Sequence, residues 1–204
     1  MLDKSIPHHN LIMRAEASAT AVVPPALPEG FTYRLYRAGD ADAWAAIETS
    51  VGEFPDEAAA QAYFARTYLP EEAQAFRRVG FVAAPDGTPV ATTSAWFDKK
   101  DGGYRPLVHW VAVRPEYQNL GLGRAAVSQA MALFSRLDPG LDVFLHTQTW
   151  SHKAVGLYLR MGFHPLRRDL WDPGYALSED ALSVFQSALP PETWRLFLSM
   201  LRDE

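Results

Sequence analysis

The order of predicted elements in the second half of the chain constrains the fold most. Strand-like runs rich in apolar and β-branched residues at 107–113 and 143–147 flank a helical pattern at 122–137. A second helical pattern at 151–161 leads into a strand-like run at 163–171. Strands joined through a helix lie parallel, because the helix carries the chain back to the same end of the sheet. The sequence therefore predicts an α/β fold with a mixed sheet.

The first half of the chain predicts antiparallel strands. Residues 31–37 alternate apolar and polar side chains, which is typical of a strand. Helical spacing begins after Asp40 and again near Asp56, and both residues are good N-caps. A strand at 79–84 and another at 88–97 are separated by a Pro-Asp-Gly turn. The predicted order is a strand, two helices and a meander of three strands.

The ends of the chain predict appendages to one central domain. Residues 1–30 indicate an arm or linker in which residues 11–13 form a short edge strand, because Pro and small polar residues dominate the segment. The domain itself is expected at 31–171. Residues 172–204 predict an extension of two short amphipathic helices that pack on the domain.

Composition excludes several classes of partner. The 204 residues carry a formal net charge of −5 and no basic cluster, so neither nucleic acid nor an anionic membrane surface is an expected partner. No apolar run approaches the length of a membrane helix, and no signal pattern begins the sequence, so we expect a cytoplasmic protein. The chain has no cysteine, which removes disulfides, thiolate metal sites and a catalytic thiol.

The segment 111–124 combines the features of an anion site. A strand ends, a short loop follows, and a helix begins at Gly121 and Gly123. The first amides of a helix have no partner within it and carry a partial positive charge. Glycines let phosphate oxygens approach the backbone, and Arg124 in the first turn adds a cation. The pattern predicts a site for phosphate or diphosphate.

Two other phosphate-binding loops fit the segment less well. The Walker loop requires a lysine directly after its last glycine, and none follows here. The dinucleotide-binding fingerprint belongs in the first βα turn of a parallel unit, whereas this loop follows a meander. We therefore expect the segment to be neither a Walker loop nor a dinucleotide-binding loop.

Two motifs resemble those of the GCN5-related N-acetyltransferases (GNAT). Gln118-x-x-Gly121-x-Gly123, preceded by Val-x-Val-x-Pro, is similar to the family's phosphate loop. Residues 151–163 are similar to its Asn-x-x-Ala-x-x-Leu-Tyr-x-x-x-Gly-Phe motif, with Ser151 where Asn is common. The resemblance covers residues 31–171 and implies a sheet of six or seven strands with helices on both faces.

The resemblance implies acetyl-CoA as cosubstrate and no metal. The backbone of Val111 and Val113 would pair with the pantetheine, and Ser151 and Ala154 would contact the coenzyme from the second motif. The phosphate loop would hold the diphosphate through these residues: Gln118, Asn119, Gly121, Leu122, Gly123 and Arg124. His146 and His152 could suggest a metal, but no carboxylate lies at metal-binding spacing nearby.

For catalysis, the resemblance implies direct attack of an amine on the thioester. Tyr158 matches the family tyrosine and is expected to donate a proton to the leaving thiolate. The base is less defined, since period two places Leu107, His109, Val111 and Val113 on one face and only His109 titrates. His109 could equally be a buried strand residue or line the acceptor pocket. Glu53, Asp98 or an ordered water relay are the other candidates.

Two functions follow from the resemblance. One is an N-acetyltransferase that acts on a primary amine of a small molecule or peptide, as a monomer or homodimer. The other is a non-catalytic acyl-CoA-binding module of the same fold, favoured by the lack of a glutamate on the strand that ends at Val113. Turnover with a panel of amines separates the two.

Overall fold

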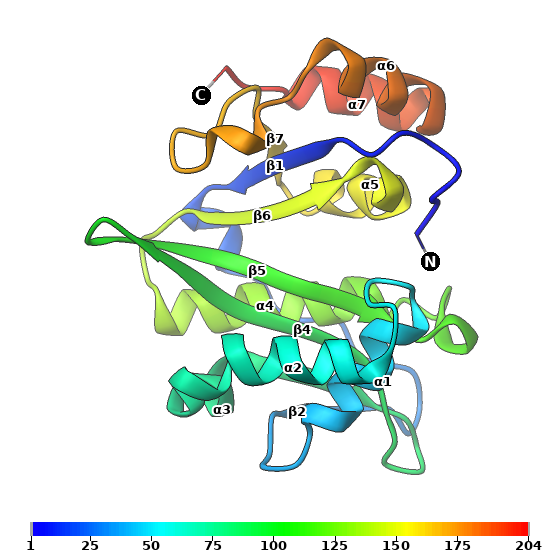
Figure 1. Ribbon diagram of the computed structural model, residues 1–204, viewed down its shortest axis with the longest axis vertical. Coiled ribbons are helices and arrows are strands. Elements are labelled where there is room, and N and C mark those ends of the chain that lie inside the picture. Colours follow the sequence, from blue (N-terminus) through cyan, green and yellow to red (C-terminus); the bar gives the residue numbers. More distant parts are fainter. Residues whose placement is uncertain (1, 204) are drawn as a thin grey trace.

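The computed structural model describes residues 2–203 and confirms the predicted mixed α/β fold (Figure 1). Within these residues seven strands form one sheet in the order β2-β3-β4-β5-β6-β1-β7. The strands are β1 Asn10–Ala15, β2 Thr32–Leu35, β3 Val79–Ala83, β4 Pro89–Lys100, β5 Gly103–Val113, β6 Val143–Gln148 and β7 His164–Pro165. The helices are α1 Ala41–Ser50, α2 Glu57–Thr67, α3 Glu72–Arg78, α4 Leu122–Leu137, α5 His152–Arg160, α6 Glu179–Ala188 and α7 Pro191–Met200.

The predicted first half is confirmed, with the addition of the short helix α3. Antiparallel pairing joins β2 to β3, β3 to β4 and β4 to β5. The side chain of Asp56 caps α2 by accepting a hydrogen bond from the amide of Ala59 at 2.8 Å, as its N-cap position predicts. Helices α1 and α2 cover one face of the sheet and α4 covers the other (Figure 1).

The prediction that residues 11–13 form an edge strand is wrong. β1 lies between β6 and β7 and is antiparallel to both. Leu11, Ile12 and Met13 have no exposed surface, so the run is buried on both faces of the sheet. A consecutive apolar run is typical of an interior strand, since an edge strand with one wet face would alternate.

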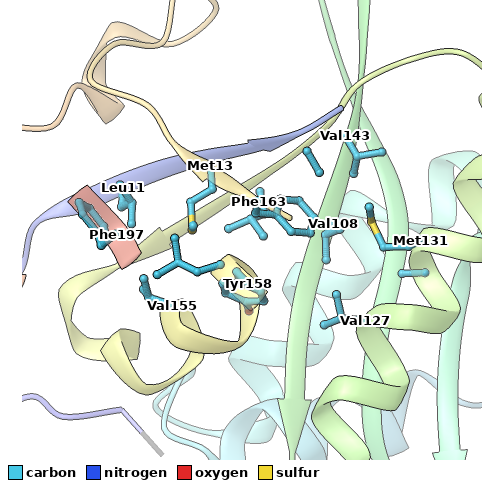
Figure 2. Packing of buried hydrophobic residues seen from close by; sticks show 14 of the residues in the cluster. Leu11, Met13, Val108, Val127, Met131, Val143, Val155, Tyr158, Phe163 and Phe197 are labelled. Atoms are coloured by element: carbon cyan, nitrogen blue, oxygen red, sulfur yellow. The ribbon is translucent and has the colours of Figure 1, made fainter. Parts of the chain in front are cut away.

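The expected strand at 163–171 is shorter than predicted. Only His164–Pro165 pair with β1, and the backbone of Arg167 then bonds to Arg202 and Leu177. The two C-terminal helices pack where this segment leaves the sheet. Phe185 of α6 and Phe197 of α7 are fully buried in the same core as β1. Figure 2 shows Phe197 beside Leu11 of β1.

The predicted parallel pairing of the strands at 107–113 and 143–147 is confirmed, but it covers few residues. β5 and β6 pair only at Leu107 with Phe144 and at Val108 with Leu145. Beyond Val108 the two strands separate, and the cavities described below lie along this divergence. No helix within residues 2–203 is long and apolar enough to span a bilayer.

Candidate active site

Two adjoining cavities lie between the diverging ends of β5 and β6. The outer cavity, of about 450 Å³, reaches the start of α4, and the inner cavity, of about 330 Å³, lies between α1, α2 and the sheet. Four residues line both cavities: Glu53, Val111, Ser151 and Tyr158. A molecule in the outer cavity would therefore meet a molecule in the inner cavity at these side chains.

The outer cavity ends at the bare N-terminus of α4. Asn119 (φ 64°) and Gly121 (φ 79°) are left-handed, and together they turn the loop into the helix. Gly121 is the N-cap, and no side chain caps this helix end. The first amides of α4 are therefore available to an anion, and the helix dipole favours negative charge there. Asn119, Gly121, Leu122 and Gly123, which the sequence predicts to bind the diphosphate, all line the cavity.

The structure brings most of the other predicted coenzyme residues to the same cavity. Val111, Val113, Gln118, Ser151 and Ala154 line it. The Gln118 side chain donates a hydrogen bond to the carbonyl of Val113 at 3.0 Å, so it ties the loop to the end of β5. Arg124 instead lines a neighbouring recess, together with Arg160, and Arg160 lines the outer cavity as well.

Tyr158 stands at the junction of the two cavities. It is 7% exposed and projects from α5 towards the sheet among core residues (Figure 2). Burial raises its pKa above the ordinary tyrosine value, and the charges of Glu53 and Glu48 raise it further. The hydroxyl is therefore protonated at neutral pH and can act as a hydrogen donor.

A β-bulge overturns the expectation that His109, Val111 and Val113 share one face. The pairing of β4 with β5 shifts between Thr92 and Ser94, and Trp110 opposite this shift has a φ of 50°. The extra residue resets the alternation of side chains. His109 therefore contacts α2, while Val111 and Val113 join the cores on the α4 face.

His109 is held between Tyr63 of α2 and Tyr68, which directly follows that helix. Its Nδ1 lies 3.0 Å from the hydroxyl of Tyr68, and its Nε2 lies 3.3 Å from the hydroxyl of Tyr63. The Tyr68 hydroxyl donates to Ser94 Oγ at 3.2 Å. Burial and then the charge of His146 lower the pKa of His109 to about 3. The imidazole is neutral at physiological pH, and both of its nitrogens have partners.

Two glutamates from α1 and the loop after it border the cavities. Glu53 lines both, and burial raises its pKa above the usual carboxyl value. Glu48 lines the inner cavity, and burial followed by the charge of Glu53 raises its pKa well above the usual value. Asp98, the other predicted candidate, borders neither cavity and pairs with Arg105 at 3.3 Å.

A buried ionic cluster lies behind His146 and Tyr175, which line the inner cavity. Arg105 Nη1 donates to both carboxylate oxygens of Asp169 at 2.9 Å, and its Nη2 lies 3.1 Å from His146 Nε2. The His146 ring stacks on Tyr175 with 3.9 Å between ring centroids. Burial and the charge of Arg105 lower the pKa of His146. Among residues 2–203, no group of three His, Cys, Asp or Glu could hold a metal ion.

The N-terminal segment crosses the mouth of the site, which sequence patterns did not indicate. Trp150 Nε1 donates to the carbonyl of Ile6 at 2.8 Å, and the Lys4 ammonium donates to the carbonyl of Gly52 at 2.8 Å. His8 lines the inner cavity. Glu48 and Tyr63 were also missed, because α1 and α2 carry no recognisable motif. Arg160 was missed because it occupies an unspecified position of the motif at 151–163.

Comparisons with known proteins identify the family of the chain. A sequence model described as Acetyltransferase (GNAT) family matches residues 43–163. The chain is 31% identical over 162 residues to a mycothiol acetyltransferase of Actinosynnema mirum, covering 78% of this chain and 52% of the relative. It is 32% identical over 151 residues to a mycothiol acetyltransferase of Salinispora tropica, covering 71% and 48%. The chain spans about half the length of the curated relatives it matches.

A solved structure supports the fold. A GCN5-related N-acetyltransferase from Sphaerobacter thermophilus superposes with a TM-score of 0.60 at 22% identity. The superposition covers 78% of this chain and 49% of that one. At this identity the likeness concerns the fold alone.

Proposed function

Because the chain belongs to the acetyltransferase (GNAT) family, we propose that it transfers the acetyl group of acetyl-CoA to a primary amine. The observation that carries the proposal is the meeting of two cavities at Glu53 and Tyr158. The outer cavity takes the coenzyme and the inner cavity takes the amine. The thioester then lies at the junction, next to one proton acceptor and one proton donor.

The outer cavity suits the coenzyme because its end is an uncapped helix N-terminus. The amides of Gly123 and Arg124 hold the diphosphate, and the left-handed residues Asn119 and Gly121 aim the loop at it. Arg124 and Arg160 flank this end and add positive charge. Val111 and Val113 line the cavity, and their backbone pairs with the pantetheine amides.

Transfer is direct, as the resemblance to the family implies, and the absence of cysteine agrees with this. The amine nitrogen attacks the thioester carbonyl, the C–N bond forms and the C–S bond breaks. Tyr158 supplies a hydrogen to the departing sulfur, and its raised pKa keeps that hydrogen in place until the sulfur is charged. The nitrogen loses a second proton as the amide forms, and that proton replaces the one that Tyr158 gave to the sulfur. The products are an amide and the free thiol of the coenzyme.

Glu53 is the better proposal for the base than His109. An imidazole with a pKa near 3 and two tyrosine partners has little tendency to take a proton from an ammonium. Glu53 lies at the junction, and its raised pKa brings it closer to that of an ammonium. His109 then positions Tyr63, which borders the inner cavity.

The inner cavity favours a small-molecule amine over a peptide. At about 330 Å³ it has room for roughly ten water-sized groups. The relatives carry the name mycothiol acetyltransferase, and we extend acetylation of a small molecule to this chain. Consumption of acetyl-CoA against a panel of amines tests the function. Coenzyme binding without consumption with any amine would instead identify a non-catalytic binding module.

Replacement of Tyr158 tests the proton donor. Tyr158→Phe is expected to lower kcat by about 100-fold, because it removes the hydrogen that stabilises the leaving sulfur. The affinity for the coenzyme changes little, since the ring remains. Steady-state kinetics and calorimetry measure the two quantities. Tyr33→Phe, which removes a buried hydroxyl outside both cavities, serves as the control. A Tyr158→Phe variant with unchanged kcat would contradict the assignment.

A further inference from the structure

Glu48 is a buried acid without a partner. Its side chain has no exposed surface, and neither carboxylate oxygen has a hydrogen-bond partner within residues 2–203. Leaving a buried polar group unpaired costs free energy, and a carboxylate costs more than a neutral group. Glu48 is also among the residues that line the inner cavity. A ligand in that cavity is therefore in a position to supply the missing partner.

The inner cavity has the lining of a site for cations. None of its lining residues among those described is lysine or arginine, and two are glutamates. Tyr63, Trp110 and Tyr175 add aromatic rings to its wall. Carboxylates and aromatic faces together are the groups that bind ammonium ions. Neutral His109 adds no opposing charge.

The two glutamates occupy different places along the cavity. Glu53 belongs to the junction with the outer cavity, whereas Glu48 lines the inner cavity alone. They are neighbours, because the amide of Glu53 donates to the carbonyl of Glu48 at 3.2 Å. One acid is therefore next to the expected thioester, and the other lies further inside. An acceptor with two basic groups would place one at each acid.

We propose that the acceptor is a compact molecule with two amines, and that Glu48 binds the amine that does not react. This rests on the proposed acetyl transfer and names its substrate class. The reacting amine gives its proton to Glu53 and attacks the thioester. The second amine stays protonated as an ammonium ion, bonded to Glu48 and surrounded by Tyr63 and Trp110. The product is acetylated once, because only one amine reaches the junction.

The test compares three acceptors of equal chain length: diaminobutane, aminobutanol and butylamine. The kcat/KM for diaminobutane should exceed that for butylamine by about 10- to 100-fold, the effect of a hydrogen bond to a charged group. Aminobutanol should fall between them, since a hydroxyl donates without a charge. Mass spectrometry should show diaminobutane carrying a single acetyl group.

Glu48→Gln keeps the shape of the side chain and removes its charge. It should reduce the preference for diaminobutane over butylamine to about threefold or less. Glu57→Gln changes an exposed acid outside both cavities and should keep the wild-type preference. Thermal unfolding and coenzyme affinity of both variants verify that they are folded.

Three results overturn the inference, and they differ from a failure of the proposed function. Equal kcat/KM values for diaminobutane and butylamine overturn it, as does a Glu48→Gln variant that keeps the preference. If no amine is acetylated, the proposed function fails. Calorimetry of diaminobutane binding to the CoA complex then decides the inference. An affinity that Glu48→Gln weakens at least tenfold supports it. Equal affinities of the wild-type and Glu48→Gln proteins for diaminobutane overturn it.

Discussion

Burial shifts the pKa values of the ionisable side chains of the site in opposite directions. It raises the pKa of Glu53 and Tyr158 and lowers that of His109, because in each case the charged form loses contact with water. The result is a neutral tyrosine, a neutral imidazole and a carboxylate of increased basicity. Residue types alone favoured His109 as the titrating group, but its enclosure between Tyr63 and Tyr68 changes that choice.

The pH profile of turnover tests Glu53 as the base. Below its raised pKa the carboxylate is protonated and cannot accept a proton, so kcat/KM should fall as pH falls through a value above the usual carboxyl range. Glu53→Gln should lower kcat/KM by about 100-fold and remove this acidic limb. The Glu57→Gln control should keep it. An acidic limb that persists in Glu53→Gln would point to another base.

His109 should make the fold sensitive to acid. The unfolded chain takes up a proton on this imidazole near pH 6.5, and the folded chain only near pH 3. Stability is therefore lost as pH falls from about 6.5 towards 3, by at most about 2 kcal/mol between pH 7 and 5. Urea unfolding at both pH values should show a smaller loss for His109→Gln. Equal losses in the two proteins would mean that His109 is protonated in the folded state.

At the scale of elements, two local irregularities shape the site. The left-handed Asn119 and Gly121 start α4 with its amides bare, and the glycine pattern predicted this from the sequence. The bulge at Trp110 has no comparable signal, because Trp is not a residue that favours a positive φ. The bulge forms where Trp110 packs among Trp44, Phe54 and Tyr63, which lie in α1, the following loop and α2, far away in the chain.

Gly121→Ala tests the helix start. An alanine at a φ of 79° costs about 1–2 kcal/mol, and relief of that strain would move the first amides of α4. We expect weaker coenzyme binding, measured by calorimetry. Gly140→Ala is the matched control, since Gly140 has the same φ and equally open surroundings beyond the other end of α4. Both variants should lose similar stability in urea unfolding, but only Gly121→Ala should lose affinity.

At the scale of the whole molecule, the N-terminal strand is part of the central sheet. β1 joins β6 to β7 and packs under α7, so residues near both ends of the chain stabilise the same core (Figure 1). The segment before β1 then crosses the mouth of the cavities through Lys4 and Ile6. Formation of the inner cavity therefore depends on residues outside the segment that the family model matches.

Met13→Ala tests this dependence. Met13 is fully buried in β1, so its truncation should cost about 2–5 kcal/mol in urea unfolding. Leu170→Ala, at a side chain that is 90% exposed, should change stability by less than about 0.5 kcal/mol. A small effect of Met13→Ala would mean that β1 contributes little to the stability of the sheet.

The sequence by itself determined the order of elements, the parallel crossover, the uncapped start of α4 and the place of Tyr158 on its helix. These depend on contacts between residues close in the chain, where spacing and glycine positions are informative. The tertiary structure alone decided that β1 enters the sheet, that a bulge turns His109 towards α2, and that Glu48 and Glu53 meet Tyr158. Those outcomes depend on packing between residues far apart in the chain, and no local pattern records which distant side chain will fill a given space.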